Sequence, residues 1–331
     1  MLRVAVRRLA AGLGVVLAVV TLTFVLITLA PGDPARLWIA PGAGAAELAT
    51  QRHALGLDQP APMRYARWLW HFAAGDWGTS LSQQRPVTEV IAAALPYTVE
   101  LAALSLFLTY AGGVLLGVFQ GFTRRKRLDQ ALTTTSLVVY GMPSYWLATM
   151  LVLVFAYAAA RYAWPAWLQL PALGVTALDA DFLPPLERLA DRARHLVLPL
   201  LTLGAVGIAG TAPYVRGAVL DQRGRWFVRA AIARGLSPLA VRFRHVLRNA
   251  APPVITLLGL SLPALFSGAV FVEWIFAWPG MGRTMVAAVI ARDYPVVMAT
   301  TAVFAALVVT GNLVADLLHA WADPRLRRAA A

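Results

Sequence analysis

The sequence predicts an all-α integral membrane protein with six membrane-spanning helices. Of its 331 residues, 59% are hydrophobic and only 14% are charged, whereas about a quarter of the residues in a typical soluble domain are charged. The charges stand in short blocks between apolar runs that are long enough to cross the roughly 30 Å core of a bilayer as helices. These six runs are residues 9–30, 101–123, 130–160, 196–215, 249–272 and 294–315.

The first run could instead belong to a cleaved signal peptide, because Arg3, Arg7 and Arg8 precede it. Two features favour a retained helix. The run is longer than the apolar part of most signal peptides, and Ala30 followed by Pro31 makes a poor cleavage site. We therefore expect this run to span the membrane.

The third run contains Pro143, which lacks a backbone donor and is expected to bend the helix. A seventh uncharged stretch, residues 162–178, is slightly too short to span and contains Pro165 and Pro171. These prolines favour an external hairpin or an interfacial segment, with Trp164 and Trp167 at the level of the lipid headgroups.

The basic residues predict the orientation of the chain, since Lys and Arg near helix ends favour the cytoplasm. The formal net charge of +13 gathers before the first run, between the second and third, between the fourth and fifth, and after the sixth. Both termini are therefore expected in the cytoplasm, which requires an even number of spans. A nucleic-acid-binding protein would instead carry its basic residues in patches on a polar surface.

Residues 31–96 are expected on the external side. Within them, residues 62–74 form a candidate amphipathic helix that carries Trp68, Trp70 and Phe72. Its aromatic face could lie against the membrane or the mouth of a pathway. It could equally pack on neighbouring external structure, and the sequence leaves both alternatives open.

The loop of residues 216–248 contains eight arginines and would cost on the order of 20 kcal/mol to embed in the membrane. A short helix over residues 226–234 is expected to end at Gly235 in a left-handed conformation. Ser237 and Pro238 then start a second helix, which Pro252 and Pro253 are expected to end. The predicted hairpin could fit a groove in another protein, or it could only contact lipid headgroups.

Residues 227–236 (FVRAAIARGL), followed by residues 247–253 (LRNAAPP), resemble the EAA loop of ABC importer permeases. Arg229 stands where the motif usually has glutamate, a departure that resembles the peptide-transporter branch. The resemblance implies that this loop contacts and couples to an ATPase. The residues it assigns to the coupling loop are Arg229, Ala230, Ala231, Arg234, Gly235 and Leu236.

Further stretches along the whole chain are similar to the dipeptide/oligopeptide/nickel (DppB/OppB-like) permeases. The collinear set is residues 30–34 (APGDP), 55–60 (LGLDQP), 75–80 (GDWGTS), 142–146 (MPSYW), 276–283 (FAWPGMGR), 291–295 (ARDYP) and 323–327 (DPRLR). The resemblance implies a type I ABC importer (MetI-like) permease fold in the bacterial inner membrane. We divide the chain into residues 1–95, a transmembrane domain of residues 96–320 with its coupling loop at 216–252, and a tail of residues 321–331.

By the same resemblance, the chain would form half of a pathway that works by alternating access. Its cargo would be dipeptides, oligopeptides, glutathione or a nickel complex. The implied partners are a homologous second permease subunit, two ABC ATPase subunits and an external substrate-binding protein, besides membrane lipid. The rival hypothesis is a secondary transporter or channel that works without ATP.

No catalytic or cofactor site is expected in this chain. Its single lysine, Lys126, is followed by Arg127, whereas a phosphate-binding loop needs Lys followed by Ser or Thr. ATP and Mg²⁺ would therefore be bound by partner subunits. The five histidines are scattered without the spacing of metal ligands.

Ionisable residues in membrane helices are candidates for function. Glu100 is expected in the first turn of its helix, where a carboxylate complements the helix dipole. Glu273, at the external end of the fifth run, and Pro143 are candidates for the pathway or its gate. Asp316 with Asn312, near the cytoplasmic end of the last run, is expected to pair with a basic residue or to cap packing.

Overall fold

The computed structural model describes residues 2–30, 35, 39, 44–54 and 56–322. Regular structure in this part of the chain is helical, apart from one antiparallel bridge between Thr79 and Pro86. The α-helices are α1 (Leu2–Leu29), α2 (Ala45–Ala54), α3 (Ala61–Ala73), α4 (Val87–Phe122), α5 (Lys126–Tyr140), α6 (Ser144–Val152), α7 (Ala159–Arg161), α8 (Pro185–Arg223), α9 (Trp226–Ala233), α10 (Pro238–Ala240), α11 (Arg248–Ile275), α12 (Met281–Ile290) and α13 (Tyr294–Ala322).

Five helical stretches among the described residues are long and apolar enough to cross a membrane. They are Arg8–Leu29, Val87–Phe122, Ser144–Arg161, Pro185–Arg223 and Tyr294–Ala315. Each contains most of one predicted run. Helix α11 covers the remaining run, residues 249–272, as one continuous helix. The all-α prediction and the order of its apolar helices are confirmed.

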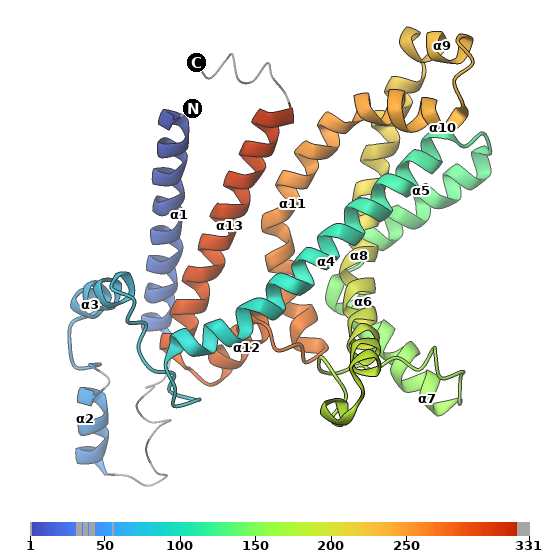
Figure 1. Cartoon of the computed structure of the whole chain (residues 1–331). Coiled ribbons are helices and arrows are strands. Elements are labelled where there is room, and N and C mark those ends of the chain that lie inside the picture. The colour runs from blue at the N-terminus through green and yellow to red at the C-terminus, as the bar shows by residue number, and fades with distance from the viewer. Residues whose placement is uncertain (1, 31–34, 36–38, 40–43, 55, 323–331) are drawn as a thin grey trace.

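The arrangement of the helices gives the molecule two distinct ends (Figure 1). The first turn of α1, the last turn of α13 and the short helices α9 and α10 lie at one end. Helices α3, α7 and α12 lie at the other end. Between them α1 packs on α13, and α4 packs along α8.

Glycines on α4 allow α8 to approach closely. Gly113, Gly117 and Gly121 recur every four residues on the face of α4 that meets α8. A Cβ atom at Gly117 would lie only 2.6 Å from the carbonyl oxygen of Ala212. Small residues at this spacing are a common way for membrane helices to pack, because they bring two backbones together.

The third predicted run is not one bent helix. Helix α5 ends at Tyr140, and Pro143 is the N-cap residue from which α6 starts. Pro143 offers no backbone donor and disfavours helical geometry at Met142, so with Gly141 it breaks the helix rather than bending it. Residues 162–178 form turns without a helix, which confirms that the seventh stretch does not span.

The expected position of Glu100 in a first helical turn is wrong. Helix α4 begins upstream at Val87 and runs through Pro96, because its first turns are buried against α12 and α13. The Glu100 carboxylate lies mid-helix and accepts a hydrogen bond of 2.6 Å from Nη2 of Arg192.

The expected helix end at Pro252 and Pro253 is also wrong, since both lie inside α11. The preceding turns, Val241–Leu247, are π-helical, a geometry that leaves some carbonyl groups without their usual helical donor. The side-chain amide of Asn249 donates to the carbonyl of His245 at 2.6 Å. Such side-chain donors let membrane helices continue through irregular turns.

The predicted amphipathic helix is confirmed as α3, Ala61–Ala73. Trp68 and Phe72, together with Tyr65, pack on a buried cluster from α1 and α13. Trp70 is not part of this face and is 76% exposed. The structure therefore supports packing on neighbouring protein for this face.

Three predicted features lie outside the described residues. They are the motif at residues 31–34, the side chain of Asp316 and the tail from residue 323.

Candidate functional site

The basic loop between α8 and α11 forms the predicted hairpin. Helix α9 is followed by Gly235, whose φ of +76° is left-handed. Ser237 then caps the next helix, because its Oγ accepts a hydrogen bond of 3.3 Å from the backbone N–H of Ala240. Pro238 occupies the first turn, where a missing N–H costs nothing.

The inner side of the hairpin is fixed to the membrane helices. Val228 and Ala231 of α9 share a buried cluster with Val241 and Val246 of the π-helical segment and with residues of α4 and α8. The guanidinium of Arg242 lies 5.2 Å from the centre of the Phe122 ring. A force applied to the hairpin would therefore be transmitted to α4 and α8.

The outer side of the hairpin is exposed. Of the six residues predicted for coupling, Arg229, Ala230, Arg234 and Gly235 are exposed. Ala231 is buried and Leu236 is partly buried, so these two support the hairpin from within.

Two apolar side chains on this outer side were missed by the sequence prediction. Trp226 is 79% exposed and Ile232 is 60% exposed. The sequence contains a signal for both residues. Apolar side chains on the arginine-bearing face of a short helix outside the membrane cannot be buried within the hairpin, and such exposed apolar residues indicate a binding surface.

A cavity of about 390 Å³ lies among the membrane helices. Helices α4, α5, α6, α8 and α11 contribute to its wall. Its described lining contains no acidic, lysine, arginine or histidine side chain, and it offers only hydroxyl groups as polar contacts. These come from Thr109, Tyr140, Ser144, Thr211, Tyr214 and Ser261.

Glycines of α8 create part of this space. A Cβ atom at Gly210 would come within 2.8 Å of the Tyr140 ring, and one at Gly207 would overlap Thr109. The break between α5 and α6 adjoins the cavity, since Tyr140 and Ser144 line it on either side of Pro143. Pro143 itself is exposed. Sequence reasoning proposed Pro143 as a bend near the pathway rather than as a break. It proposed none of the hydroxyl residues, because nothing in their spacing distinguishes them from residues of helix packing.

Glu273, in the last turn of α11, caps the next helix. Its carboxylate is fully buried and accepts hydrogen bonds from Thr98 Oγ1 at 2.7 Å and from the backbone N–H groups of Gly282 and Arg283 at 2.7 and 3.2 Å. A carboxylate at these first N–H groups stabilises the start of α12. Glu273 lines neither of the two described cavities. Any role at a gate would therefore act through its contacts with α4 and the start of α12.

Comparisons with known proteins place this arrangement in a family. Residues 113–328 match the family model described as binding-protein-dependent transport system inner membrane component, and residues 1–102 match the model for the N-terminal part of such components. A solved structure, an amino acid ABC transporter with histidines, has the same fold with a TM-score of 0.50 at 14% identity, covering 70% of this chain and 94% of that one.

Relatives of known name match nearly the whole chain. The oligopeptide transport system permease protein AppB of Bacillus subtilis is 36% identical and covers 97% of this chain and 98% of its own length. The di/tripeptide permease DppB of Pseudomonas aeruginosa is 35% identical, with 99% of each chain covered. The glutathione permease GsiC of Salmonella paratyphi A is 34% identical, also with 99% of each covered.

All three relatives are permease proteins of transport systems, so they are transport subunits rather than enzymes. The match to the family model over most of the chain agrees with the apolar helices, the central cavity and the hairpin. The chain belongs to the family of binding-protein-dependent transport system inner membrane components, as a multi-pass permease subunit of the type I ABC importer fold.

Proposed function

We propose that the chain forms half of a transmembrane pathway for short peptides or related solutes such as glutathione, with a homologous permease subunit as the other half. The names of its relatives support this substrate class. The described cavity lining supports it too. Hydroxyl groups can form hydrogen bonds with peptide groups, and a wall without charged side chains does not favour one sign of charge on the cargo over the other.

The observation that carries the coupling mechanism is the two-sided hairpin. Its inner side is buried against α4 and α8, while its outer side presents Trp226 and Ile232 beside Arg229 and Arg234. Exposed aromatic, apolar and arginine side chains are typical of protein interfaces. In this proposal the outer side docks on one of two ATPase subunits, which bind ATP and Mg²⁺, and the inner side transmits their closure to the pathway.

The proposed orientation places the hairpin and both termini in the cytoplasm. The hairpin lies at the same end of the molecule as the first turn of α1 and the last turn of α13 (Figure 1). The loops at this end carry the positive charge that favours the cytoplasm. The opposite end, with α3 and α12, would face the external substrate-binding protein.

The docking surface is tested by replacing the two large exposed apolar residues of α9, Trp226→Ser with Ile232→Ser. We expect the variant to insert and to keep the second permease, but to lose the ATPase subunits during purification. The control is Trp167→Ser, which changes a tryptophan of residues 162–178 that is 73% exposed. Retention of the ATPase subunits by the hairpin variant at the wild-type ratio would contradict the proposed docking surface.

An ATP-independent transporter has no comparable support. Such a protein would need ionisable groups along its pathway. Among the described residues that line the central cavity none is Asp, Glu, Lys, Arg or His, and the Glu273 carboxylate is engaged in capping α12.

A further inference from the structure

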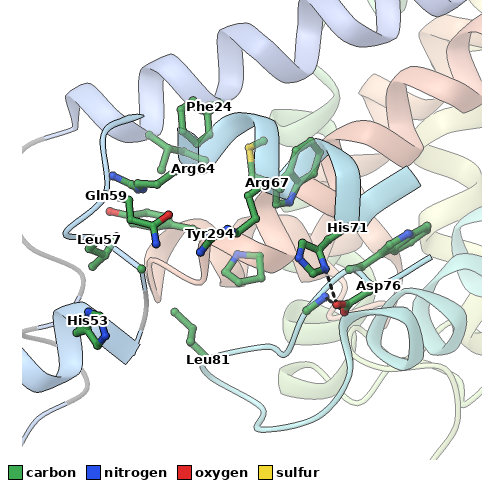
Figure 2. A pocket seen from close by; sticks show the side chains of 17 residues that line it. Phe24, His53, Leu57, Gln59, Arg64, Arg67, His71, Asp76, Leu81 and Tyr294 are labelled. Carbon is green, nitrogen blue, oxygen red and sulfur yellow. Dashed lines mark hydrogen bonds and ion pairs between the residues drawn. The ribbon is translucent and has the colours of Figure 1, made fainter. Parts of the chain in front are cut away.

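A second pocket, of about 560 Å³, lies at the external end of the molecule. It shares no lining residue with the central cavity. Figure 2 shows Phe24 of α1 and Tyr294 of α13 on its wall, with the segments around Leu57 and Leu81 closing other sides. The proposed transport function does not use this pocket.

Basic residues of α3 face the pocket. Arg64, Arg67 and His71 stand at positions i, i+3 and i+7, which share one face of a helix, and all three line the pocket (Figure 2). His71 is paired with Asp76, with 3.0 Å between Nδ1 and Oδ2. Among the described residues no carboxylate forms an ion pair with Arg64 or Arg67.

The pocket also has a histidine with a carboxylate partner. His53 lines the pocket, and its Nδ1 lies 2.8 Å from Oδ2 of Asp58. The guanidinium of Arg64 lies 5.8 Å from the centre of the Phe24 ring. Arg64 and Arg67 therefore bring two guanidinium groups beside an aromatic wall, and groups of this kind bind phosphate oxygens in two-pronged pairs. The Asp58 carboxylate interacts electrostatically with Arg67 but forms its short contact with His53.

The membrane helices fix the depth of the pocket. Phe24 and Ile27 lie in the last turns of the span Arg8–Leu29, and Tyr294 begins the span Tyr294–Ala315. The pocket is thus level with the external headgroup layer. On the same turns of α1, Leu26 is 59% exposed and Leu29 is 75% exposed, so acyl chains of lipid can reach the pocket's edge.

A ligand that fits this pocket must supply a hydrogen-bond donor as well as an anion, because of Gln59. Oε1 of Gln59 is buried without a hydrogen-bond partner among the described residues, and Gln59 lines the pocket. A buried acceptor without a donor costs free energy. The oxygens of a phosphodiester can accept hydrogen bonds from the arginines but cannot donate one. A glycerol hydroxyl can donate a hydrogen bond to Oε1 of Gln59.

We infer that this pocket binds the phosphoglycerol headgroup of an anionic phospholipid from the external leaflet. The phosphate pairs with Arg64 and Arg67, the glycerol hydroxyl donates to Gln59, and the acyl chains lie along Leu26 and Leu29. The bound lipid ties α3 and the external segment to α1. Arg and Lys are less frequent on the external side of membrane proteins. In this arrangement Arg64 and Arg67 lie there because they bind the phosphate.

The test measures lipid retained by the full chain, purified with its associated subunits, in native mass spectrometry after exchange into palmitoyl-oleoyl phosphatidylglycerol or phosphatidylcholine. The wild type should retain phosphatidylglycerol preferentially. The double variant Arg64→Gln, Arg67→Gln should lose this preference by about fivefold for each arginine. The matched control Arg85→Gln removes an external arginine outside the pocket, whose Nε donates to Gln83, and should keep the preference.

A second measurement needs no variant. A photoreactive phosphatidylglycerol headgroup should crosslink to peptides covering residues 56–81 in the wild-type complex. Equal retention of the two lipids by the wild type, or crosslinks confined to other helices, would overturn the inference. Displacement of the lipid by millimolar inorganic phosphate would also overturn it, because the site would then belong to a soluble anion.

Discussion

Asp293 accepts a hydrogen bond of 2.6 Å from the hydroxyl of Ser80, although 213 residues separate them. The same carboxylate oxygen accepts hydrogen bonds from the backbone N–H and the hydroxyl of Ser82, at 2.9 and 2.7 Å. Asp293 is fully buried and follows Arg292, whose φ of +52° is left-handed. One carboxylate thus fixes the loop before α4 to the turn between α12 and α13.

Asp293→Ala should release this loop. The buried hydroxyl of Ser80 would lose its acceptor, at a cost of about 1–3 kcal/mol. Hydrogen exchange of residues 76–86 should become faster while that of α8 is unchanged. Asp181→Ala is the control, because its side chain is 95% exposed. If Asp293→Ala and Ser80→Ala are additive in the double variant, the two residues do not act through their hydrogen bond.

Gly117→Ala should weaken the packing of α4 on α8. The added Cβ would lie 2.6 Å from the carbonyl oxygen of Ala212, and a backbone atom cannot move aside without separating the helices. Overpacking of this kind costs about 1–3 kcal/mol. Gly14→Ala in α1 is the matched control, since no atom lies within 4 Å of its Cβ position. Equal thermal denaturation midpoints for the two variants would contradict this account.

The order of the apolar helices along the chain could be predicted because the length of an apolar run is a local property of the sequence. The turn at Gly235 followed from residue chemistry for the same reason. Pairings between distant segments could not be predicted. The capping contacts of Glu273 could not be predicted, because its partners, Thr98 and the N–H groups of α12, are brought to it only by the fold. Helix α4 begins ahead of Pro96 because tertiary burial outweighs the local signal.

Asp129 should contribute to stability in a pH-dependent manner. This residue precedes the predicted run 130–160, and two hydrogen bonds from Arg216, at 2.8 and 2.5 Å, lower the pKa of its carboxyl below the ordinary 3.8. A lowered pKa stabilises the folded state above pH 3.8, and this stabilisation is lost as the pH falls through the folded-state value. Both side chains are partly exposed, so about 1 kcal/mol is expected.

The comparison is between wild type and Asp129→Asn, measured by thermal denaturation at about pH 7, 5 and 3. The difference in thermal denaturation midpoint between wild type and variant should be the same at pH 7 and 5 and smaller at pH 3. Asp181→Asn, whose carboxylate lies 4.0 Å from Arg188, should show no such difference. If the difference in midpoint between Asp129→Asn and wild type increases as the pH falls, the sign of this prediction is contradicted.

The orientation can be measured because the chain contains no cysteine. A single cysteine at Ser237, on the hairpin, should react with a membrane-impermeant maleimide only after spheroplasts are permeabilised. A cysteine at Phe182, which is 90% exposed in the loop before α8, should react in intact spheroplasts. The reverse pattern would invert the proposed topology.

The most direct test of the coupling hairpin is the rate of ATP-driven uptake into proteoliposomes that contain the whole complex with Gly235→Val or Gly235→Asn. No atom lies within 4 Å of the Cβ position of Gly235, so only its φ of +76° penalises a side chain. Valine should cost about 1–2 kcal/mol or more in this left-handed conformation, whereas asparagine adopts it readily. The account predicts that the valine variant inserts normally but loses uptake and substrate-stimulated ATP hydrolysis together, while the asparagine variant keeps both. Uptake by the valine variant at the wild-type rate, with the ATPase subunits bound, would contradict the claim that this hairpin couples ATP hydrolysis to transport.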